Sequence, residues 1–188
     1  MLLPEAGARP GLLPLACGVA VAECLGGWGL AAELKWPNDV LVRGSKLAGV
    51  LVEAGSTAGR IQDVVAGVGV NLERVPALAA EAAQPATSVR ALTGRAPGLA
   101  LAASDLLRAL AAWHARLLAE PAAVLAAWRE RSVPWWGETV EVRSAGQGLR
   151  GRLAGLEPDG ALLLELPGGA RERVTAGEML RLRCARGE

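Results

Sequence analysis

The patterning of hydrophobic residues changes at Pro134, and this change most constrains the fold. Before it, Ala- and Leu-rich stretches with helical spacing run from Leu99 to Leu118 and from Ala122 to Arg131. After it, the chain breaks into short alternating runs separated by glycine, which is typical of short strands. Five such runs predict a small β module. We therefore expect two domains, residues 1–133 and residues 134–188.

The first domain combines helices with short β-like runs. A helical pattern begins near Leu13 and ends at Gly26-Gly27. The tight Gly44-Ser45 connection between two of the β-like runs predicts a hairpin. These patterns predict an α+β fold, with a mixed sheet and flanking helices followed by a closed or sandwich-like β module. The β-like runs of the first domain are 33–36, 40–43, 46–53 and 61–72.

Composition excludes several function classes. The formal net charge is +1 and the aromatic residues, all Trp, make up 3% of the chain, so we expect no nucleic-acid partner. The apolar run from Leu12 to Val21 is too short to span a membrane and indicates a buried helix. Cys17 and Cys24 lie too far apart on that helix for a disulfide, and one histidine with scattered cysteines gives no zinc site. We therefore expect a cytoplasmic protein without a membrane partner.

The densest group of chemically useful side chains lies around the predicted hairpin. It consists of Lys35-Trp36-Pro37-Asn38-Asp39 and then Lys46-Leu47-Ala48-Gly49. Taken alone, the first run is ordinary turn chemistry and Lys46 is a solvated hairpin lysine. Together they place a cation, an amide and a carboxylate around one short hairpin, which is what a nucleotide phosphate with its Mg²⁺ requires.

A second unusual run is the β-branched stretch from Val64 to Leu72, which Gly67 and Gly69 interrupt. Glycine inside a strand often marks the close approach of a ligand or of another backbone. A dinucleotide-binding fingerprint would need a third glycine and a following helix, and the chain after Asn71 offers neither. Close packing without a ligand explains these glycines equally well.

With these motifs in this order, the chain resembles the biotin protein ligase family, the biotin–[acetyl-CoA-carboxylase] ligases. The resemblance rests on residues 35–39, 46–53 and 67–72, and Thr87-Ser88, the helical region and the closing β module are also similar. It implies a catalytic domain like that of class II synthetases and biotin–lipoate ligases, followed by a small C-terminal SH3-like β-barrel.

The resemblance also implies a two-step reaction. Biotin and Mg·ATP would form biotinyl-adenylate, and a lysine of a biotin carboxyl carrier protein domain would then take the biotinyl group. A lysine between the carboxylate and the phosphate is the expected catalytic device, and we expect Lys46 to be that lysine. By similarity, Asp39 would place Mg²⁺ and phosphate, Asn38 and Asn71 would contact the nucleotide, and Gly49 and Gly67 would let the backbone close on biotin.

Family members carry a Gly/Arg-rich loop upstream of the helix that begins here near Leu13, and some carry a DNA-binding domain before it. Neither is recognisable in this sequence, so we expect the C-terminal portion of the ligase, either clipped or degenerate. The alternatives are a non-catalytic nucleotide-binding or scaffolding remnant, and a lipoate or octanoate transferase, against which the Lys35–Asp39 run argues. A homodimer stays open.

Overall fold

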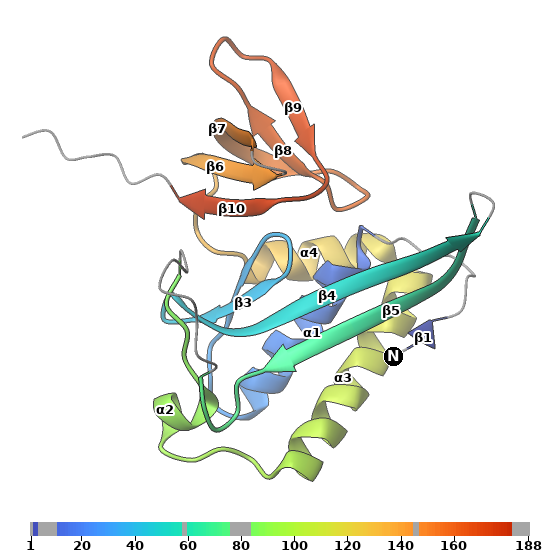
Figure 1. Ribbon diagram of the computed structural model, residues 1–188, viewed down its shortest axis with the longest axis vertical. Helices are drawn as coiled ribbons and strands as arrows, with labels where there is room; N and C mark the ends of the chain where they lie inside the picture. The colour runs from blue at the N-terminus through green and yellow to red at the C-terminus, as the bar shows by residue number, and fades with distance from the viewer. Residues whose placement is uncertain (1, 4–10, 58–59, 76–83, 145–146, 182–188) are drawn as a thin grey trace, which may run out of the picture.

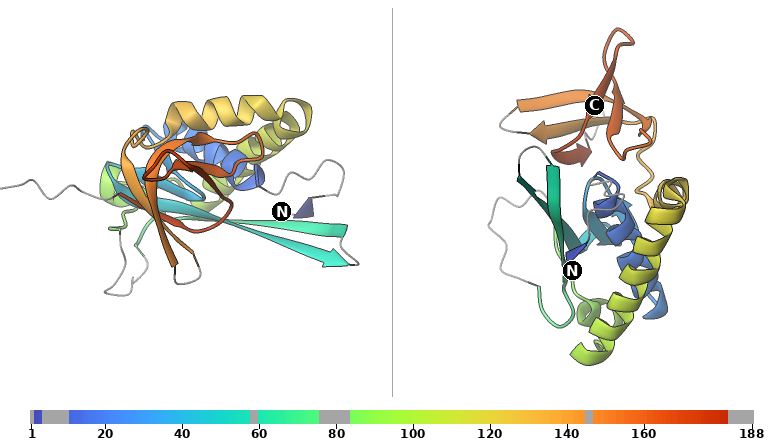
Figure 2. Two further views of the ribbon diagram at one scale, coloured as in Figure 1. Left: turned by 90° about the horizontal axis from the view of Figure 1, so that it is seen from above. Right: turned by 90° about the vertical axis from the view of Figure 1, so that its right-hand side faces the viewer.

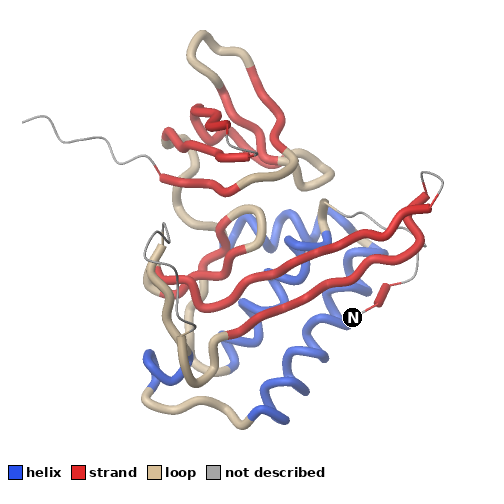
Figure 3. Tube along the Cα trace, in the orientation of Figure 1, coloured by secondary structure: helices blue, strands red, loops and turns tan. Residues whose placement is uncertain are grey.

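The computed structural model describes residues 2–3, 11–57, 60–75, 84–144 and 147–181. They form two antiparallel sheets, with helices packed on the first sheet only (Figures 1 and 3). The helices are α1 (Leu13–Gly27), α2 (Val89–Thr93), α3 (Leu99–Ala119) and α4 (Pro121–Arg131). The first sheet contains β1 (Leu2–Leu3), β2 (Glu33–Lys35), β3 (Asp39–Val42), β4 (Ser45–Thr57) and β5 (Arg60–Val70). The second contains β6 (Thr139–Ser144), β7 (Gln147–Leu156), β8 (Leu162–Glu165), β9 (Arg171–Val174) and β10 (Glu178–Arg181).

The first sheet has the order β1-β5-β4-β3-β2. Helix α1 packs between this sheet and the pair α3 and α4, as the right-hand view of Figure 2 shows. Most α1 side chains are buried, which confirms the prediction of a buried helix and explains why its pattern is apolar on every side. No helix in the described ranges is long and apolar enough to cross a membrane. Cys17 and Cys24 are buried free thiols.

The helices cover one face of the first sheet and leave the other face open (Figure 2). Side chains alternate along β5, where Val64 and Ala66 are buried beneath the helices while Val65, Gly67 and Gly69 are exposed. The strand glycines predicted to matter therefore lie on the open face.

The second sheet has the order β10-β6-β7-β8-β9. We expected a closed barrel, but β9 and β10 are its two edges and no ladder among the described residues joins them. The first sheet also differs from expectation. We expected a mixed sheet, yet within the described ranges all its ladders are antiparallel, and parallel pairing there is limited to the isolated bridges Leu34↔Ser132 and Lys46↔Ala86.

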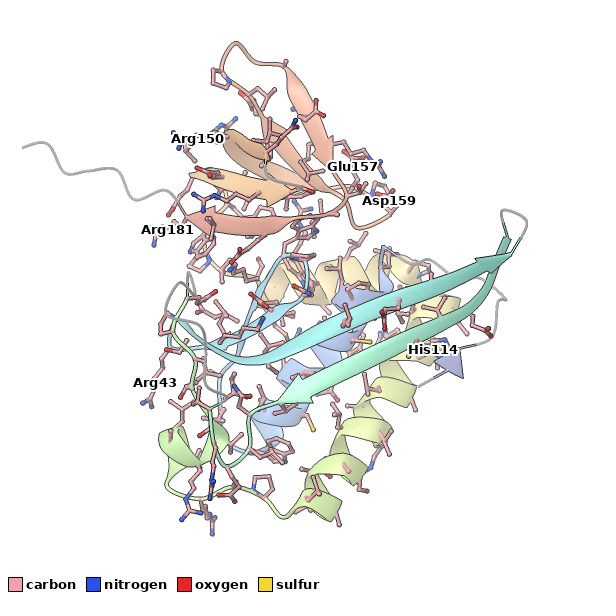
Figure 4. The ribbon with its side chains drawn as sticks, in the orientation of Figure 1. Arg43, His114, Arg150, Glu157, Asp159 and Arg181 are labelled. Carbon is pink, nitrogen blue, oxygen red and sulfur yellow. The ribbon has the colours of Figure 1, made fainter. Side chains whose placement is uncertain are left out.

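The two sheets meet at the β2–β3 hairpin. The Trp36 indole Nε1, which is buried, donates a hydrogen bond of 3.0 Å to the carbonyl oxygen of Gly160, in the turn before β8. Figure 4 labels Asp159 in this same turn, on the side of the second sheet that faces the first. The backbone N–H of Val133 donates to the Leu34 carbonyl, which ties the connection after α4 to β2. The second sheet is therefore anchored beside the candidate motif.

Candidate active site

The predicted motif residues line a cavity of about 460 Å³ between the β2–β3 hairpin, strand β4 and the turn before β10. Lys35, Asn38, Asp39 and Lys46 all contribute to its wall. The structure thus brings together the cation, amide and carboxylate that the sequence placed around one hairpin. The remaining lining residues are Pro14, Trp36, Pro37, Val50, Leu51, Val52, Thr175, Ala176, Gly177 and Glu178.

Two lysines share one carboxylate in this cavity. The Lys46 Nζ forms an ion pair with Asp39 Oδ1, and the Lys35 Nζ lies 3.5 Å from Asp39 Oδ2. Their surroundings differ, because the Lys46 side chain is 43% exposed while that of Lys35 is 3% exposed. The Asp39 carboxylate, 12% exposed, is nearly removed from solvent and is compensated by both ammonium groups.

These two residues are the only lysines among the 20 Lys and Arg residues of the chain. The other 18 are arginines, whose guanidinium is a planar fork of donors that stays charged. Lysine instead offers a compact ammonium on a flexible stem. Both lysines of the chain therefore meet Asp39 as compact ammonium groups.

A β-bulge turns Lys46 towards the cavity. Val40 pairs with Ala48, but its neighbour Leu41 pairs with Lys46, so Leu47 is an extra residue in β4. Leu47, the extra residue, and its neighbour Ala48 are both buried. In regular alternation Lys46 would share the buried face of Ala48 and Val50. The bulge instead puts its side chain on the open face.

The absence of a side chain at Gly49 leaves room for the Lys46 side chain. A Cβ atom added at Gly49 would lie 3.2 Å from Lys46 Cε, so the lysine stem occupies the space above this glycine. Gly67 has a different setting, since it pairs with the exposed Leu51 and a Cβ there would make ordinary contact, 3.7 Å from the Leu51 carbonyl oxygen. Packing within the protein thus requires glycine more strictly at 49 than at 67.

The two predicted asparagines differ in position. Asn38 lines the cavity and its Nδ2 donates a 2.8 Å hydrogen bond to the Val50 carbonyl, which fixes the hairpin against β4. Asn71 follows β5, outside that lining, and its Nδ2 donates to the Thr87 carbonyl at 3.0 Å. Asn38 is thus placed to touch a ligand, while Asn71 holds the segment before α2.

The comparisons with known proteins agree with the motifs. Residues 15–71 match the family model described as "Biotin/lipoate A/B protein ligase family", and residues 136–182 match "Biotin protein ligase C terminal domain". The biotin–[acetyl-CoA-carboxylase] ligase of Paracoccus denitrificans is 35% identical over 186 residues, which cover 95% of this chain and 77% of that protein. This chain belongs to the biotin protein ligase family.

Further relatives agree with that assignment. The biotin–[acetyl-CoA-carboxylase] ligase of Mycobacterium tuberculosis is 36% identical over 178 residues, covering 92% of this chain and 63% of that protein. The apo biotin protein ligase of Aquifex aeolicus has the same fold, with a TM-score of 0.82 at 23% identity over 97% of this chain and 80% of that one. The chain is a ligase of this family.

Three parts of this ligase site were not predicted from the sequence. Lys35 received no role from the sequence. Its position next to Trp36 and four residues before Asp39 was the signal that could have indicated one. Gln84, which accepts a 2.8 Å hydrogen bond from Lys35, carries no sequence signal. The turn at 175–178 forms a wall of the cavity, and nothing in the alternating pattern of the second sheet marked it.

Proposed function

We propose that this ligase activates biotin with ATP as biotinyl-adenylate and transfers the biotinyl group to a lysine of a biotin carboxyl carrier domain. The observation that carries the proposal is the half-exposed Lys46 ammonium, held by Asp39 in a cavity beside an open sheet face. Structures of relatives with this fold support it, among them the Aquifex aeolicus ligase in complex with biotin and ATP and the Leishmania major ligase in complex with biotinyl-5-AMP.

Lys46 serves the first step. A carboxylate oxygen of biotin attacks the α-phosphorus of ATP, an O–P bond forms, and the bond to pyrophosphate breaks with its electron pair leaving on pyrophosphate. Both reactants are anionic, so their approach is opposed by charge until a cation lies between them. The Lys46 ammonium, 43% exposed and mounted on a flexible stem, is placed to neutralise both.

The second step needs an acceptor from outside the chain. The neutral amine of the carrier lysine attacks the acyl carbon of the adenylate, a C–N bond forms, and AMP leaves with the electrons of the C–O bond while the amine loses a proton. Lys46 can stabilise the negative charge that develops on the acyl oxygen. Lys35 is buried and Lys46 is ion-paired, so neither of the chain's own lysines is a free acceptor.

The open sheet face offers room for the acid. Gly49 pairs with Gly69, and a Cβ at Gly69 would meet nothing within 4 Å. The neighbouring pair, Leu51 with Gly67, adds an exposed leucine that also lines the cavity. A pair of glycines beside an apolar side chain leaves bare backbone, against which a small ligand can lie. We infer that biotin lies here over Gly67 and Gly69, with the Lys46 stem above Gly49 at its edge.

Magnesium fits this site only as a companion of ATP. Both Asp39 oxygens face lysine ammonium groups, and the described residues contain no group of three side chains able to hold a metal ion. Mg²⁺ prefers phosphate oxygens and water with one or two carboxylates. Asp39 would supply that single carboxylate, and the ion would supply charge neutralisation of the phosphates.

The remaining roles follow from position. We propose that Asn38 contacts the nucleotide directly, because it lines the cavity. The predicted nucleotide contact of Asn71 is proposed as indirect, through the Thr87 carbonyl that it holds. Residues 1–133 would form the catalytic domain, and residues 134–188 a supporting domain whose turn at 175–178 completes the cavity wall.

The test is biotin-dependent exchange of pyrophosphate into ATP by the purified chain. Lys46→Ala should lower the exchange rate by a factor on the order of 100, because one preorganised electrostatic contact has that value. Arg43→Gln is the matched control, since Arg43 lies in the same hairpin, is exposed and does not line the cavity. Near-normal exchange by Lys46→Ala would contradict the assignment, and no exchange by the unchanged chain would favour a nucleotide-binding remnant.

A further inference from the structure

Lys35 is a buried cation to which the reaction assigns no contact with substrate. Its side chain is 3% exposed, and its Nζ donates to Gln84 Oε1 at 2.8 Å while lying 3.5 Å from Asp39 Oδ2. A buried ammonium is costly unless it is paired and hydrogen-bonded. Lys35 meets both conditions through one carboxylate and one amide, so its ammonium is fixed in place.

Lys46 is much more exposed than Lys35. It shares the same carboxylate, but it is 43% exposed and its stem lies across the bare backbone of Gly49. A lysine side chain in this setting can move by rotation about its own bonds. The proposed chemistry favours this movement, because an ammonium that stays on Asp39 has fewer of its three N–H donors free for the substrate's carboxylate and phosphate.

Charge balance shows what that movement requires. With both lysines present, the cluster of Lys35, Asp39 and Lys46 carries one net positive charge, and departure of Lys46 leaves the neutral pair Lys35–Asp39. Without Lys35, departure would leave the Asp39 carboxylate, 12% exposed, without a counterion from the protein until Mg²⁺ arrives. A largely buried charge without a partner is strongly unfavourable, so Lys46 would stay where it is.

We propose that Lys35, fixed by Gln84, is a positioning residue that keeps Asp39 neutralised while Lys46 moves to the substrate. The inference rests on the proposed function and deepens it. The Lys46 side chain has two positions, one on Asp39 and one on the substrate. Lys35 shifts the equilibrium between them towards the substrate, because it stabilises Asp39 most when Lys46 is away.

The segment before α2 forms hydrogen bonds with both lysines. Gln84 Nε2 donates to the Gly44 carbonyl at 3.2 Å, so the side chain that fixes Lys35 also touches the β3–β4 turn. Two residues of the same segment hold the Lys46 backbone, since its N–H donates to the Pro85 carbonyl and its carbonyl accepts from the Thr87 N–H. The Lys46 backbone is therefore fixed and only its side chain is left to move.

The two-lysine composition allows a direct test. Amine acetylation of the native chain, followed by mass spectrometry of the peptides, reports Lys46 and Lys35 separately, with the N-terminal amine as an internal reference. In Lys35→Met, Lys46 should be acetylated at least about threefold more slowly than in the unchanged chain, because it is held on Asp39. In Lys35→Met with Asp39→Asn, the rate should return to that of the unchanged chain or exceed it.

Gln84→Glu is a second variant that keeps the buried cation. Its carboxylate competes with Asp39 for Lys35, so Lys46 should again be acetylated more slowly. In pyrophosphate exchange, we expect Lys35→Met to lower kcat/KM about tenfold. A change of this size matches the coupling energy between two residues in contact. If Lys46 reacts equally fast in the unchanged chain, Lys35→Met and Gln84→Glu, the inference is overturned. The acetylation rates need no turnover, so they test this inference even where exchange itself fails.

Discussion

A Cβ atom placed on Gly49 would lie 3.2 Å from Lys46 Cε and 3.4 Å from Lys46 Nζ. The first distance is tighter than ordinary contact and the second is at its limit, so the Lys46 stem occupies space that a larger residue at position 49 would need. Gly49 also pairs with Asp39 in the β3–β4 ladder. The glycine, the carboxylate and the bulge at Leu47 together define the position of the ammonium on Asp39 in this structure.

Gly49→Ala should therefore shift the Lys46 ammonium without unfolding the protein, because the displaced atoms are the end of a flexible side chain. We expect biotin-dependent pyrophosphate exchange to fall at least about tenfold, since small misplacements of catalytic groups have large effects. Gly55→Ala on the same strand is the control, because a Cβ there lies 3.9 Å from its nearest neighbour. Equal exchange rates for the two variants would show that Gly49 does not position Lys46.

Asp39→Asn removes the carboxylate that both lysines share. An amide neither neutralises Lys35 nor attracts a hydrated cation, so we expect the Mg²⁺ concentration at half-maximal exchange to rise and the maximal rate to fall about tenfold or more. Asp63→Asn is the control, since Asp63 is exposed at the far end of β5 and pairs with Gly55. An unchanged Mg²⁺ titration would remove Asp39 from the metal-binding role.

Gly160→Ala tests the junction between the two sheets. Gly160 has a φ of +90°, and a Cβ there would lie 2.6 Å from the Gly11 carbonyl oxygen, so backbone must shift to admit it. We expect a loss of at least about 2 kcal/mol in unfolding free energy, from strain plus overpacking. Gly168 has a φ of +97° with nothing within 4 Å of its Cβ, so Gly168→Ala should cost only about 1 kcal/mol. Urea unfolding of both variants measures the difference, and equal losses would show that the contact with Gly11 is not tight.

The hairpin was predictable because its signals are local. Turn chemistry at Gly44-Ser45 and the run from Lys35 to Asp39 fix the β2–β3–β4 arrangement within a few residues, and the structure confirms it. The helices α1, α3 and α4 were predicted for the same reason, since their apolar spacing and the proline at the start of α4 lie within each segment. Of the site, the sequence placed Lys46, Asp39 and Asn38 together, and they do line one cavity.

What could not be predicted depends on contacts between distant segments. The bulge at Leu47 follows from how β4 pairs with β3, and no rule of alternation in β4 alone reveals it. Lys35 gains its importance from Gln84, which is 49 positions away in the chain. The family resemblance implied a barrel, and the five short alternating strands predicted a closed or sandwich-like module, but edge pairing depends on non-local geometry. Helix α2 is only five residues long, too short to show a period.

The second sheet contains a carboxylate whose charge is fixed by two arginines. The Glu141 side chain, 7% exposed, accepts a 2.5 Å hydrogen bond from Arg143 Nε and one of 2.9 Å from Arg150 Nε. Figure 4 labels Arg150 on this sheet. The hydrogen bond from Arg143, and then that from Arg150, lower the pKa of Glu141 below its ordinary value of 4.5. The folded protein therefore favours the ionised carboxylate more strongly than the unfolded chain does.

This pKa shift predicts how stability changes with pH. A carboxyl group whose pKa is lower when folded stabilises the protein above its ordinary pKa, and this contribution is lost as the pH falls through the folded value. Glu141→Gln should thus lower Tm at pH 7, and the gap to the unchanged chain should narrow as the pH falls below 4.5. The control is Glu172→Gln on β9, an exposed position where no gap is expected at either pH. Thermal unfolding by circular dichroism at pH 7 and pH 3 measures both gaps. If the Tm difference for Glu141→Gln stays constant down to pH 3, its cause is packing and not charge. The packing partner would be Gly148, where an added Cβ would lie 3.1 Å from Glu141 Oε1.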